Sequence, residues 1–249
     1  MKILVCISSV PDTTTKISFT NNSTEFDKSG VQFVINPNDE FGLTKALQLK
    51  EANPGSTVSV IHVGSDTSDP IIRKALAIGA DDAIRINTEA VDALQVANEI
   101  SIYVKANPFD LILTGKESID HNGAIVPHAL AEILGIPSVS PCIGLEIDGT
   151  VAKLAGIVDG GKEEFSASLP VVVGGQKGIV EERDLRIPNM RGIMQARSKP
   201  LNIVTASGSA SSQRIANFDA PTPKAACKMV DANNMEELVN LLQNEAKVI

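Results

Sequence analysis

The chain has 249 residues, of which 43% are hydrophobic and 21% are charged, so it is long enough to bury a full core. Its formal net charge of −8, with one Tyr and no Trp, argues against nucleic acid as a partner, because that surface needs basic residues and stacking rings. The apolar runs are far shorter than the ~20 residues of a membrane helix, so we expect no stable membrane insertion. The three cysteines, Cys6, Cys142 and Cys227, are an odd number and lie far apart in the sequence. This suggests reduced thiols, and we expect a cytoplasmic protein.

The first half of the chain alternates predicted strands with predicted helices. The opening apolar run predicts a buried strand and not a signal peptide, because Pro11 and Asp12 close it without a cleavage site. Asn38 or Asp39 is expected to cap one helix, and Asp69 another. The strands are predicted at residues 2–7, 57–63, 83–86 and 111–114, and the helices at 39–52, 69–79, 91–106 and from about 126. Near-continuous apolar strands in repeated βα units indicate an α/β fold with a doubly wound, mostly parallel sheet.

The second half of the chain has a different pattern. Residues 145–169 carry Asp-Gly turns at Asp148 and Asp159 between short strand-like runs, which predicts antiparallel hairpins added to one edge of the sheet. A further strand is predicted at residues 171–173. Beyond it the hydrophobic periodicity weakens, and a Ser-rich stretch and a Pro-containing linker precede a last helix near Asn234. We expect this C-terminal arm to pack on another chain.

The segment from residue 111 to residue 137 is the most informative about function. An apolar strand runs into Gly115 and Lys116, and a polar stretch follows before the next helix. The first amides of a helix lack internal partners and, with the helix dipole, attract anions such as phosphate. Pro127 delays the regular helix to about Val126, which would leave residues 115–125 as an ordered loop of free N–H groups. The spacing is not that of a P-loop, so we predict a nucleotide site of an unusual kind.

Several candidate residues have plain structural interpretations beside the functional ones. Asn36 follows a predicted strand, and it either lies in an ordinary turn or faces the same crevice as Gly115. Lys116 either meets a phosphate or is a solvated lysine. Asp120 and Asn122 either cap the following helix, bind a ribose hydroxyl, or do both. The three histidines lack metal-ligand spacing, no metal site is expected, and no hydrolase motif is present, so catalytic residues are not assigned.

A locally basic stretch at residues 183–200 interrupts this acidic chain. Arginines alternate there with Ile187, Met190, Ile193 and Met194. Exposed methionines beside arginines form adaptable docking surfaces, in which the charges guide the encounter. The alternative is a linker whose apolar residues pack back on the parent domain.

Six segments in order resemble the beta subunit of electron transfer flavoproteins. They begin with VPDT at residues 10–13, INPNDEFGLTKALQLKE at 35–51 and ALAIGADDAIRI at 75–86. The series continues with DLILTGKESID at 110–120, ALAEILGIPSV at 129–139 and LRIPNMRGIMQARSKP at 185–200. The resemblance implies an adenine-nucleotide α-hydrolase-like fold and an electron carrier that is not itself an enzyme. It also implies a heterodimer with an alpha subunit and electron exchange with flavin dehydrogenases such as acyl-CoA dehydrogenases.

The resemblance further implies cofactors and the residues that hold them. FAD is shared with the alpha subunit, close to residues 10–13, and the beta subunit binds AMP or, in electron-bifurcating members, a second FAD. The implied nucleotide-binding residues are Cys6, Asn36, Pro37, Asn38, Asp39, Val63, Gly64, Gly115, Lys116, Glu117, Ser118, Ile119, Asp120, His121, Asn122, Gly123, Ala124, Ile125 and Val126. The implied partner-docking residues are Met190, Arg191, Ile193, Met194 and Arg197.

The implied organisation is a nucleotide-binding domain at residues 1–182, a recognition loop at 183–200, and an arm with a helix at 201–249 that packs on the alpha subunit. Two positions depart from the family: Ser8 stands where Lys is common, and Ile125 stands where Gln is common, so Ile125 can offer only its backbone N–H. The form of the recognition loop is similar to that of members from anaerobes. The alternatives are an ATP-using enzyme of the same superfamily, for which residues 7–10 lack the pyrophosphate-binding motif, and a stand-alone nucleotide-sensing module.

Overall fold

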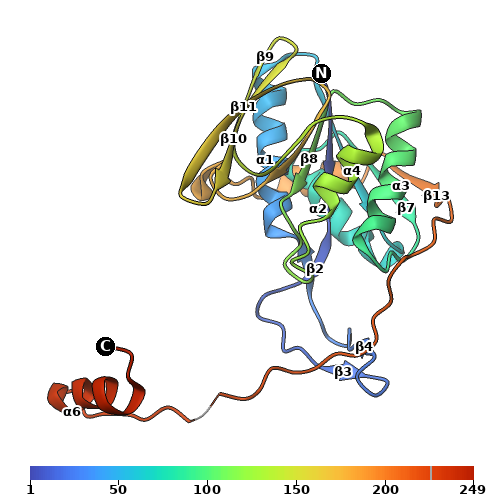
Figure 1. Ribbon diagram of the computed structural model, residues 1–249. Coiled ribbons are helices and arrows are strands. Elements are labelled where there is room, and N and C mark those ends of the chain that lie inside the picture. Colours follow the sequence, from blue (N-terminus) through green and yellow to red (C-terminus); the bar gives the residue numbers. More distant parts are fainter. Residues whose placement is uncertain (225) are drawn as a thin grey trace.

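A computed structural model describes residues 1–224 and 226–249 (Figure 1). Its centre is a nine-stranded sheet in the order β11-β10-β9-β12-β8-β1-β6-β7-β13. The strands of this sheet are β1 (Lys2–Cys6), β6 (Thr57–Val63), β7 (Asp82–Asn87), β8 (Leu111–Gly115), β9 (Ser138–Asp148), β10 (Val151–Val158), β11 (Gly161–Ser168), β12 (Val171–Gly175) and β13 (Leu201–Thr205). All neighbouring pairs from β9 through β12 to β13 are parallel, whereas β10 pairs antiparallel with both β9 and β11. The predicted mostly parallel sheet with a hairpin extension is confirmed.

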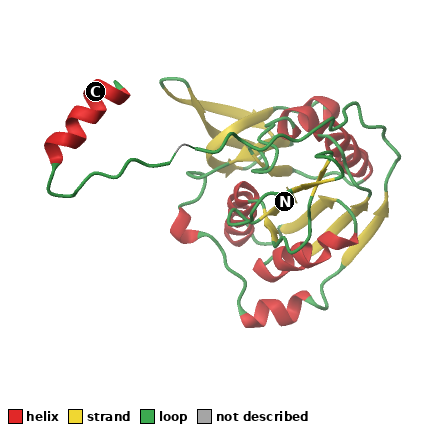
Figure 2. Cartoon of the chain, turned by 90° about the horizontal axis from the view of Figure 1, so that it is seen from below, coloured by secondary structure: helices red, strands yellow, loops and turns green. Residues whose placement is uncertain are grey.

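Helices cover both faces of this sheet (Figure 2). The helices are α1 (Pro37–Ala52), α2 (Asp69–Ile78), α3 (Ala93–Ala106), α4 (Val126–Leu134), α5 (Met190–Ala196) and α6 (Met235–Asn240), with short 3-10 turns η1 (Asp66–Ser68) and η2 (Glu182–Asp184) and a π-helical turn η3 (Leu241–Ala246). Side chains alternate along β1: Ile3 and Val5 join the core beneath α1 and α2, while Leu4 and Cys6 join the core beneath α3 and α4. Two separate cores explain why the parallel strands are apolar throughout.

Local signals set the helix ends, although two of the predicted caps are wrong. Asp92 caps α3 by accepting a hydrogen bond from the amide of Gln95 at 2.7 Å. The N-cap position of α2 is Ser68 instead of Asp69, and that of α1 is Asn36 instead of Asn38 or Asp39; neither side chain makes a capping hydrogen bond. Each of these two helices has a proline in its first turn. Proline has no backbone N–H, so one fewer donor at the helix start needs an acceptor, and both helices begin without the predicted side-chain caps.

Four short strands form two small sheets outside the main one. Strand β2 (Ser9–Pro11), which follows β1 in the chain, pairs antiparallel with β5 (Phe33–Ile35). Strands β3 (Phe19–Thr20) and β4 (Glu25–Phe26) form a hairpin that projects from the body (Figure 1). No helix of the described residues combines the length and apolar composition that crossing a bilayer requires.

The segment expected to be a C-terminal arm begins as part of the domain. Strand β13 pairs in parallel with β7, from Leu201 opposite Ala83 to Thr205 opposite Asn87, so the expected boundary at residue 201 is wrong for these residues. After β13 the chain runs along α3, where Glu99 accepts hydrogen bonds from the amides of Ser207 and Ser209 at 2.8 and 3.1 Å. The last part, with α6, leads away from the body, as Figure 1 shows.

The arm also touches the projecting hairpin. The ring of Phe218 stacks on that of Phe19, with centroids 4.9 Å apart and planes 6° from parallel. The amide of Phe218 donates to the carbonyl oxygen of Ser23 at 2.7 Å. Residues 207–218 are therefore attached to the rest of the chain at Glu99, at Asp92 and at the β3–β4 hairpin before the arm departs.

Candidate functional site

The order of the strands reverses beside β1, and in open parallel sheets such a reversal opens a crevice at the carboxyl ends of the strands. Strands β6 and β7 follow β1 on one side, and the chain then crosses to the other side to form β8 and β12. Ligands in open parallel sheets bind beyond the carboxyl ends of the strands at such a crossover. Strand β1 ends at Cys6 and β8 ends at Gly115, so the two loops that follow these strands flank the crevice.

Asp39 links the elements around this crevice. One carboxylate oxygen accepts from the amide of Ser8 at 2.7 Å, and the other accepts from the amide of Gly115 at 2.8 Å and from the side-chain amide of Asn36 at 2.9 Å. The side chain is buried, and burial raises the pKa of the carboxyl to about 7 although these three donors favour its ionised form. The residue predicted to be a helix cap is thus a buried junction between the ends of β1 and β8.

Asn36 connects the junction to the loop after β8. Its side-chain nitrogen also donates to the carbonyl oxygen of Glu117 at 2.9 Å, and its side-chain oxygen accepts from the amide of Ile119 at 3.2 Å. Asn38 donates to the same Glu117 carbonyl at 3.0 Å. The structure therefore brings the Asn36 turn and the Gly115 loop to one crevice. Because both Asn36 amide hydrogens have acceptors, its side chain shapes the loop.

Gly115 lies in the tightest part of the junction. A Cβ atom at this position would collide with a carboxylate oxygen of Asp39 and come within 2.8 Å of the Cβ of Asn38. It would also stand 3.0 Å from the side-chain nitrogen of Asn36. Only glycine lets the end of β8 approach the first turn of α1 this closely.

Four amides of the loop after β8 are hydrogen-bonded within the chain. Besides the amides of Gly115 and Ile119, that of Lys116 donates to Gly175 at 2.9 Å and that of Asn122 donates to Ser118 at 2.8 Å. The expectation that the whole of residues 115–125 offers free amides is therefore wrong for these four.

A continuous run of open amides leads from this loop into the first residue of α4. Within the described residues, the amides of Gly123, Ala124, Ile125 and Val126 have no hydrogen-bond acceptor. Asn122 and Ala124 have φ of 48° and 52°, a left-handed conformation that costs free energy for residues other than glycine. Consecutive amides in such a conformation form a concave site for an anion.

The charged side chains of the loop are partly paired with one another. Lys116 lies 3.2 Å from the carboxylate of Glu117, so its charge is shared between that partner and the crevice. The side chain of His121 lies 3.8 Å from that of Asp120. Neither of the predicted caps, Asp120 or Asn122, caps α4, because the capping position falls on Ile125, whose apolar side chain cannot accept a hydrogen bond.

The opposite wall of the crevice comes from the ends of β1 and β6. Cys6 is buried, and burial raises the pKa of its thiol far above the ordinary value, so it is a core residue and not a reactive one. Val63 is the last residue of β6, and the carbonyl of Gly64, which follows it, accepts a hydrogen bond from Arg85 at 3.1 Å. The Arg85 side chain is 4% exposed and pairs with Asp69 at 2.7 Å. Sequence reasoning missed Arg85, whose only signal is a charge within an apolar strand.

The recognition segment both packs on the domain and exposes apolar side chains. Helix α5 packs against α2, and Ala196 is buried in that contact. Met190 and Met194 remain 75% and 69% exposed, and Ile187 just before the helix is 82% exposed. The interpretation that the segment packs back on the domain is therefore confirmed for one face of the helix, and the docking role of the other face stays a prediction. Arg191, Ile193 and Arg197 are also exposed.

Comparisons with known proteins agree with this architecture. A family profile described as "Electron transfer flavoprotein domain" matches residues 24–209. The chain is 35% identical to the electron transfer flavoprotein subunit beta of Bacillus subtilis and 34% identical to that of Syntrophomonas wolfei; both alignments span 100% of this chain, with 100% and 98% of the relatives. It is 30% identical to subunit CarD of the caffeyl-CoA reductase-Etf complex of Acetobacterium woodii, over 82% of this chain and 78% of the relative. The chain therefore belongs to the electron transfer flavoprotein family and matches its beta subunits along its whole length.

Proposed function

We propose that this chain is the beta subunit of a heterodimeric electron carrier, which moves electrons between flavin dehydrogenases, such as acyl-CoA dehydrogenases, and an acceptor. Full-length similarity to beta subunits supports this role. Asp39 and Cys6 at the crevice are buried in structural contacts, and we infer that this chain binds and positions a cofactor without acting as acid, base or nucleophile.

The proposed beta-subunit ligand is AMP or a second FAD, with a phosphate at the loop after β8. The single observation that carries this proposal is the run of four open amides, residues 123–126, at the start of α4 and beside the strand crossover. In this proposal the nucleotide is flanked by the Asn36 turn on one side and by Val63 and Gly64, at and just after the end of β6, on the other. Because Ile125 has an apolar side chain, contact with the phosphate at that position is through the backbone alone.

The principal FAD is proposed to lie between this chain and the alpha subunit, close to residues 10–13. When bound, a flavin supplies one- and two-electron redox chemistry. Residues of this chain hold the segment in shape: Val10 lies in β2 opposite Val34, and Asp12 accepts from the amide of Thr14 at 2.8 Å. The exposed Thr13 then faces outward from an ordered turn.

Two surfaces are proposed to meet other proteins. Helix α5 would dock on the dehydrogenase, because Met190 and Met194 are exposed beside Arg191 and Arg197. The arm beyond residue 213 would pack on the alpha subunit. Helix α6 exposes large apolar side chains away from the body, which is unfavourable unless a partner covers them; these are Met235, Leu238 and Val239.

The proposal is tested by purifying the chain alone and with the alpha subunit. Alone it should carry little or no yellow flavin, and addition of the alpha subunit should restore stoichiometric FAD. Strong flavin binding without the alpha subunit would contradict a shared site. ATP turnover by the isolated chain would favour an ATP-using enzyme of the same fold.

A further inference from the structure

Helix α5 is seated on α2 by an unusually close backbone contact. A Cβ atom on Gly192 would collide with the carbonyl oxygen of Ala77 and stand 3.3 Å from its carbonyl carbon. That obstacle is main chain of α2, so it cannot rotate away as a side chain can. The absence of a side chain at Gly192 is therefore what allows α5 to lie directly on the last turn of α2.

Arg73, on α2, forms hydrogen bonds with the C-terminal end of α5. Its Nη1 atom donates to the carbonyl oxygens of Ala196 and Lys199, each at 2.7 Å. The carbonyls at the end of a helix lack partners within the helix, and a guanidinium that donates to them makes charge-assisted hydrogen bonds. This contact joins residues 123 and 126 positions apart in the chain.

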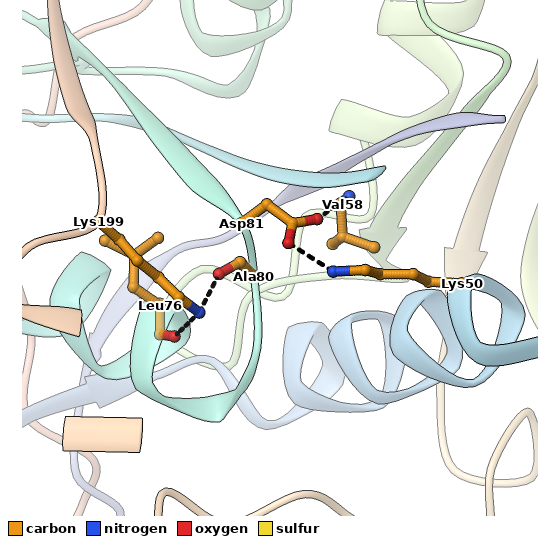
Figure 3. Close-up of polar contacts among 6 residues, drawn as sticks. All are labelled: Lys50, Val58, Leu76, Ala80, Asp81 and Lys199. Carbon is orange, nitrogen blue, oxygen red and sulfur yellow. Dashed lines mark hydrogen bonds and ion pairs between the residues drawn. The ribbon is translucent and has the colours of Figure 1, made fainter. Parts of the chain in front are cut away.

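Lys199 makes the reciprocal contact with the end of α2. Its Nζ atom donates to the carbonyl oxygens of Leu76 and Ala80, at 2.8 and 2.5 Å (Figure 3). The side chain is half-buried, and burial lowers the pKa of its ammonium group. We call Gly192, Arg73 and Lys199 together the α5 seat.

The turn that follows α2, on which the α5 seat depends, is itself held by hydrogen bonds and an ion pair. Asp81, one residue after Ala80, pairs with Lys50 of α1 at 2.5 Å and accepts from the amide of Val58 at 2.9 Å, as Figure 3 shows. On the other side, the carbonyl of Pro200 accepts from the amide of Ala83 at 3.0 Å, where β13 begins. The recognition segment is thus held at its C-terminal end by the body of the domain, while Met190 and Met194 point outward.

We propose that Arg73 and Lys199 are positioning residues that hold the methionine face of α5 in one orientation for docking. This inference rests on the docking role proposed above. A docking segment that is already ordered loses less conformational entropy on binding than a loose loop, so fixing it strengthens association. Arg73 lies on α2 and Lys199 follows the end of α5, so both act by fixing the helix and do not serve as contact residues themselves.

The test uses the reconstituted heterodimer and an acyl-CoA dehydrogenase from the same organism as electron donor. The variants are Arg73→Ala, Arg73→Lys and Met190→Ala, with Lys162→Ala on the exposed strand β11 as a control for loss of one positive charge. Two quantities are measured: hydrogen exchange of the amides of residues 190–199, and the KM and kcat of the dehydrogenase for the carrier. Flavin content is checked for each protein.

For Arg73→Ala we expect exchange in residues 190–199 to accelerate by about tenfold or more, since two charge-assisted bonds are lost. KM should rise several-fold with kcat and flavin content unchanged, Arg73→Lys should recover part of both effects, and Lys162→Ala should behave as the parent. Unchanged exchange in Arg73→Ala would overturn the seat. Faster exchange with an unchanged KM, while Met190→Ala raises KM, would show that docking does not need the seat. An unchanged KM in both would instead remove the docking role, and the inference with it.

Discussion

The loop at residues 115–126 and the helix α5 both face outward, but they are built in opposite ways. The loop is held by buried side chains, Asn36 and Asp39, and offers open backbone amides. Helix α5 is held through its backbone carbonyls and offers side chains, chiefly Met190 and Met194.

The difference follows from the size of what each region would bind. A phosphate is small and needs several donors fixed within hydrogen-bond distance, which rigid backbone amides supply. A protein partner presents a broad surface, and flexible methionines can adapt to it while the helix beneath them stays fixed. Changes to the first region should therefore affect folding and nucleotide together, whereas changes to the second should affect association alone.

The largest effect is expected for Gly115→Ala. The added methyl group meets the Asp39 carboxylate and the Asn38 Cβ atom, so the junction must open. We expect a loss of about 3 kcal/mol in the free energy of unfolding, measured in urea, together with loss of bound nucleotide. Gly161→Ala is the matched control, because Gly161 has open space around its Cβ position and lies in the exposed strand β11. Equal stabilities for the two variants would show that the junction tolerates a side chain.

A smaller loss is expected for Asp39→Asn. The amide nitrogen of Asn would face the amide of Ser8, so one donor stays unsatisfied, and we expect the free energy of unfolding to fall by about 1–3 kcal/mol at pH 5. The exposed Asp159→Asn is the control.

The cost of Asp39→Asn should also depend on pH. Burial raises the pKa of the Asp39 carboxyl in the folded chain to about 7, against 3.8 for the free group. Between these values the folded state binds more protons than the unfolded state, so the stability contributed by Asp39 is complete below pH 4 and is lost as the pH rises through 7. The difference between parent and Asp39→Asn should therefore shrink from pH 4 to pH 8. A difference in unfolding free energy that stays constant from pH 4 to pH 8 would contradict a raised pKa of the buried Asp39 carboxyl.

Met190→Ala should weaken docking without any effect on the loop. Removal of an exposed anchor side chain should raise the KM of the dehydrogenase for the carrier about tenfold and leave bound flavin and nucleotide intact. Ile157→Ala, at a comparably apolar exposed position on β10, should leave KM unchanged. If both variants behave as the parent, α5 is not the docking surface.

The smallest effect is expected for Phe218→Ala, where the arm leaves the body. Loss of the stacked contact with Phe19 removes about 0.5–1.5 kcal/mol of local stability. Exchange of the amide of residue 218, which donates to Ser23, should accelerate, whereas Ile215→Ala should leave it unchanged. The same exchange rate in parent and Phe218→Ala would mean that the ring contact does not fix the arm.

The sequence predicted the parts of the fold that have strong local patterns. Continuous apolar strands predicted the parallel sheet, and Asp-Gly turns predicted the hairpins of β9, β10 and β11. Strand β13 was missed, because it lies at the sheet edge with one pairing partner and largely exposed side chains, so it lacks both periodicities. The short strands β3 and β4 are too brief to produce a pattern.

The grouping of the candidate loops could be predicted, but the contacts between them could not. Loops that follow parallel strands must meet at one edge, so the Asn36 turn and the Gly115 loop could be placed together. The bond from the Gly115 amide to Asp39 spans 76 residues and leaves no local signal, which is why Asp39 was interpreted as a cap. The ion pair of Arg85 with Asp69 joins two different elements and likewise leaves no local signal in the sequence.

The most direct test of the account is a count of the nucleotides released from the purified heterodimer. The open amides of residues 123–126 predict two per heterodimer, one of them the FAD shared with the alpha subunit and the other AMP or a second FAD. Gly115→Ala should retain the first and lose the second. A parent heterodimer that releases a single FAD and no second nucleotide would contradict a nucleotide site at the loop after β8.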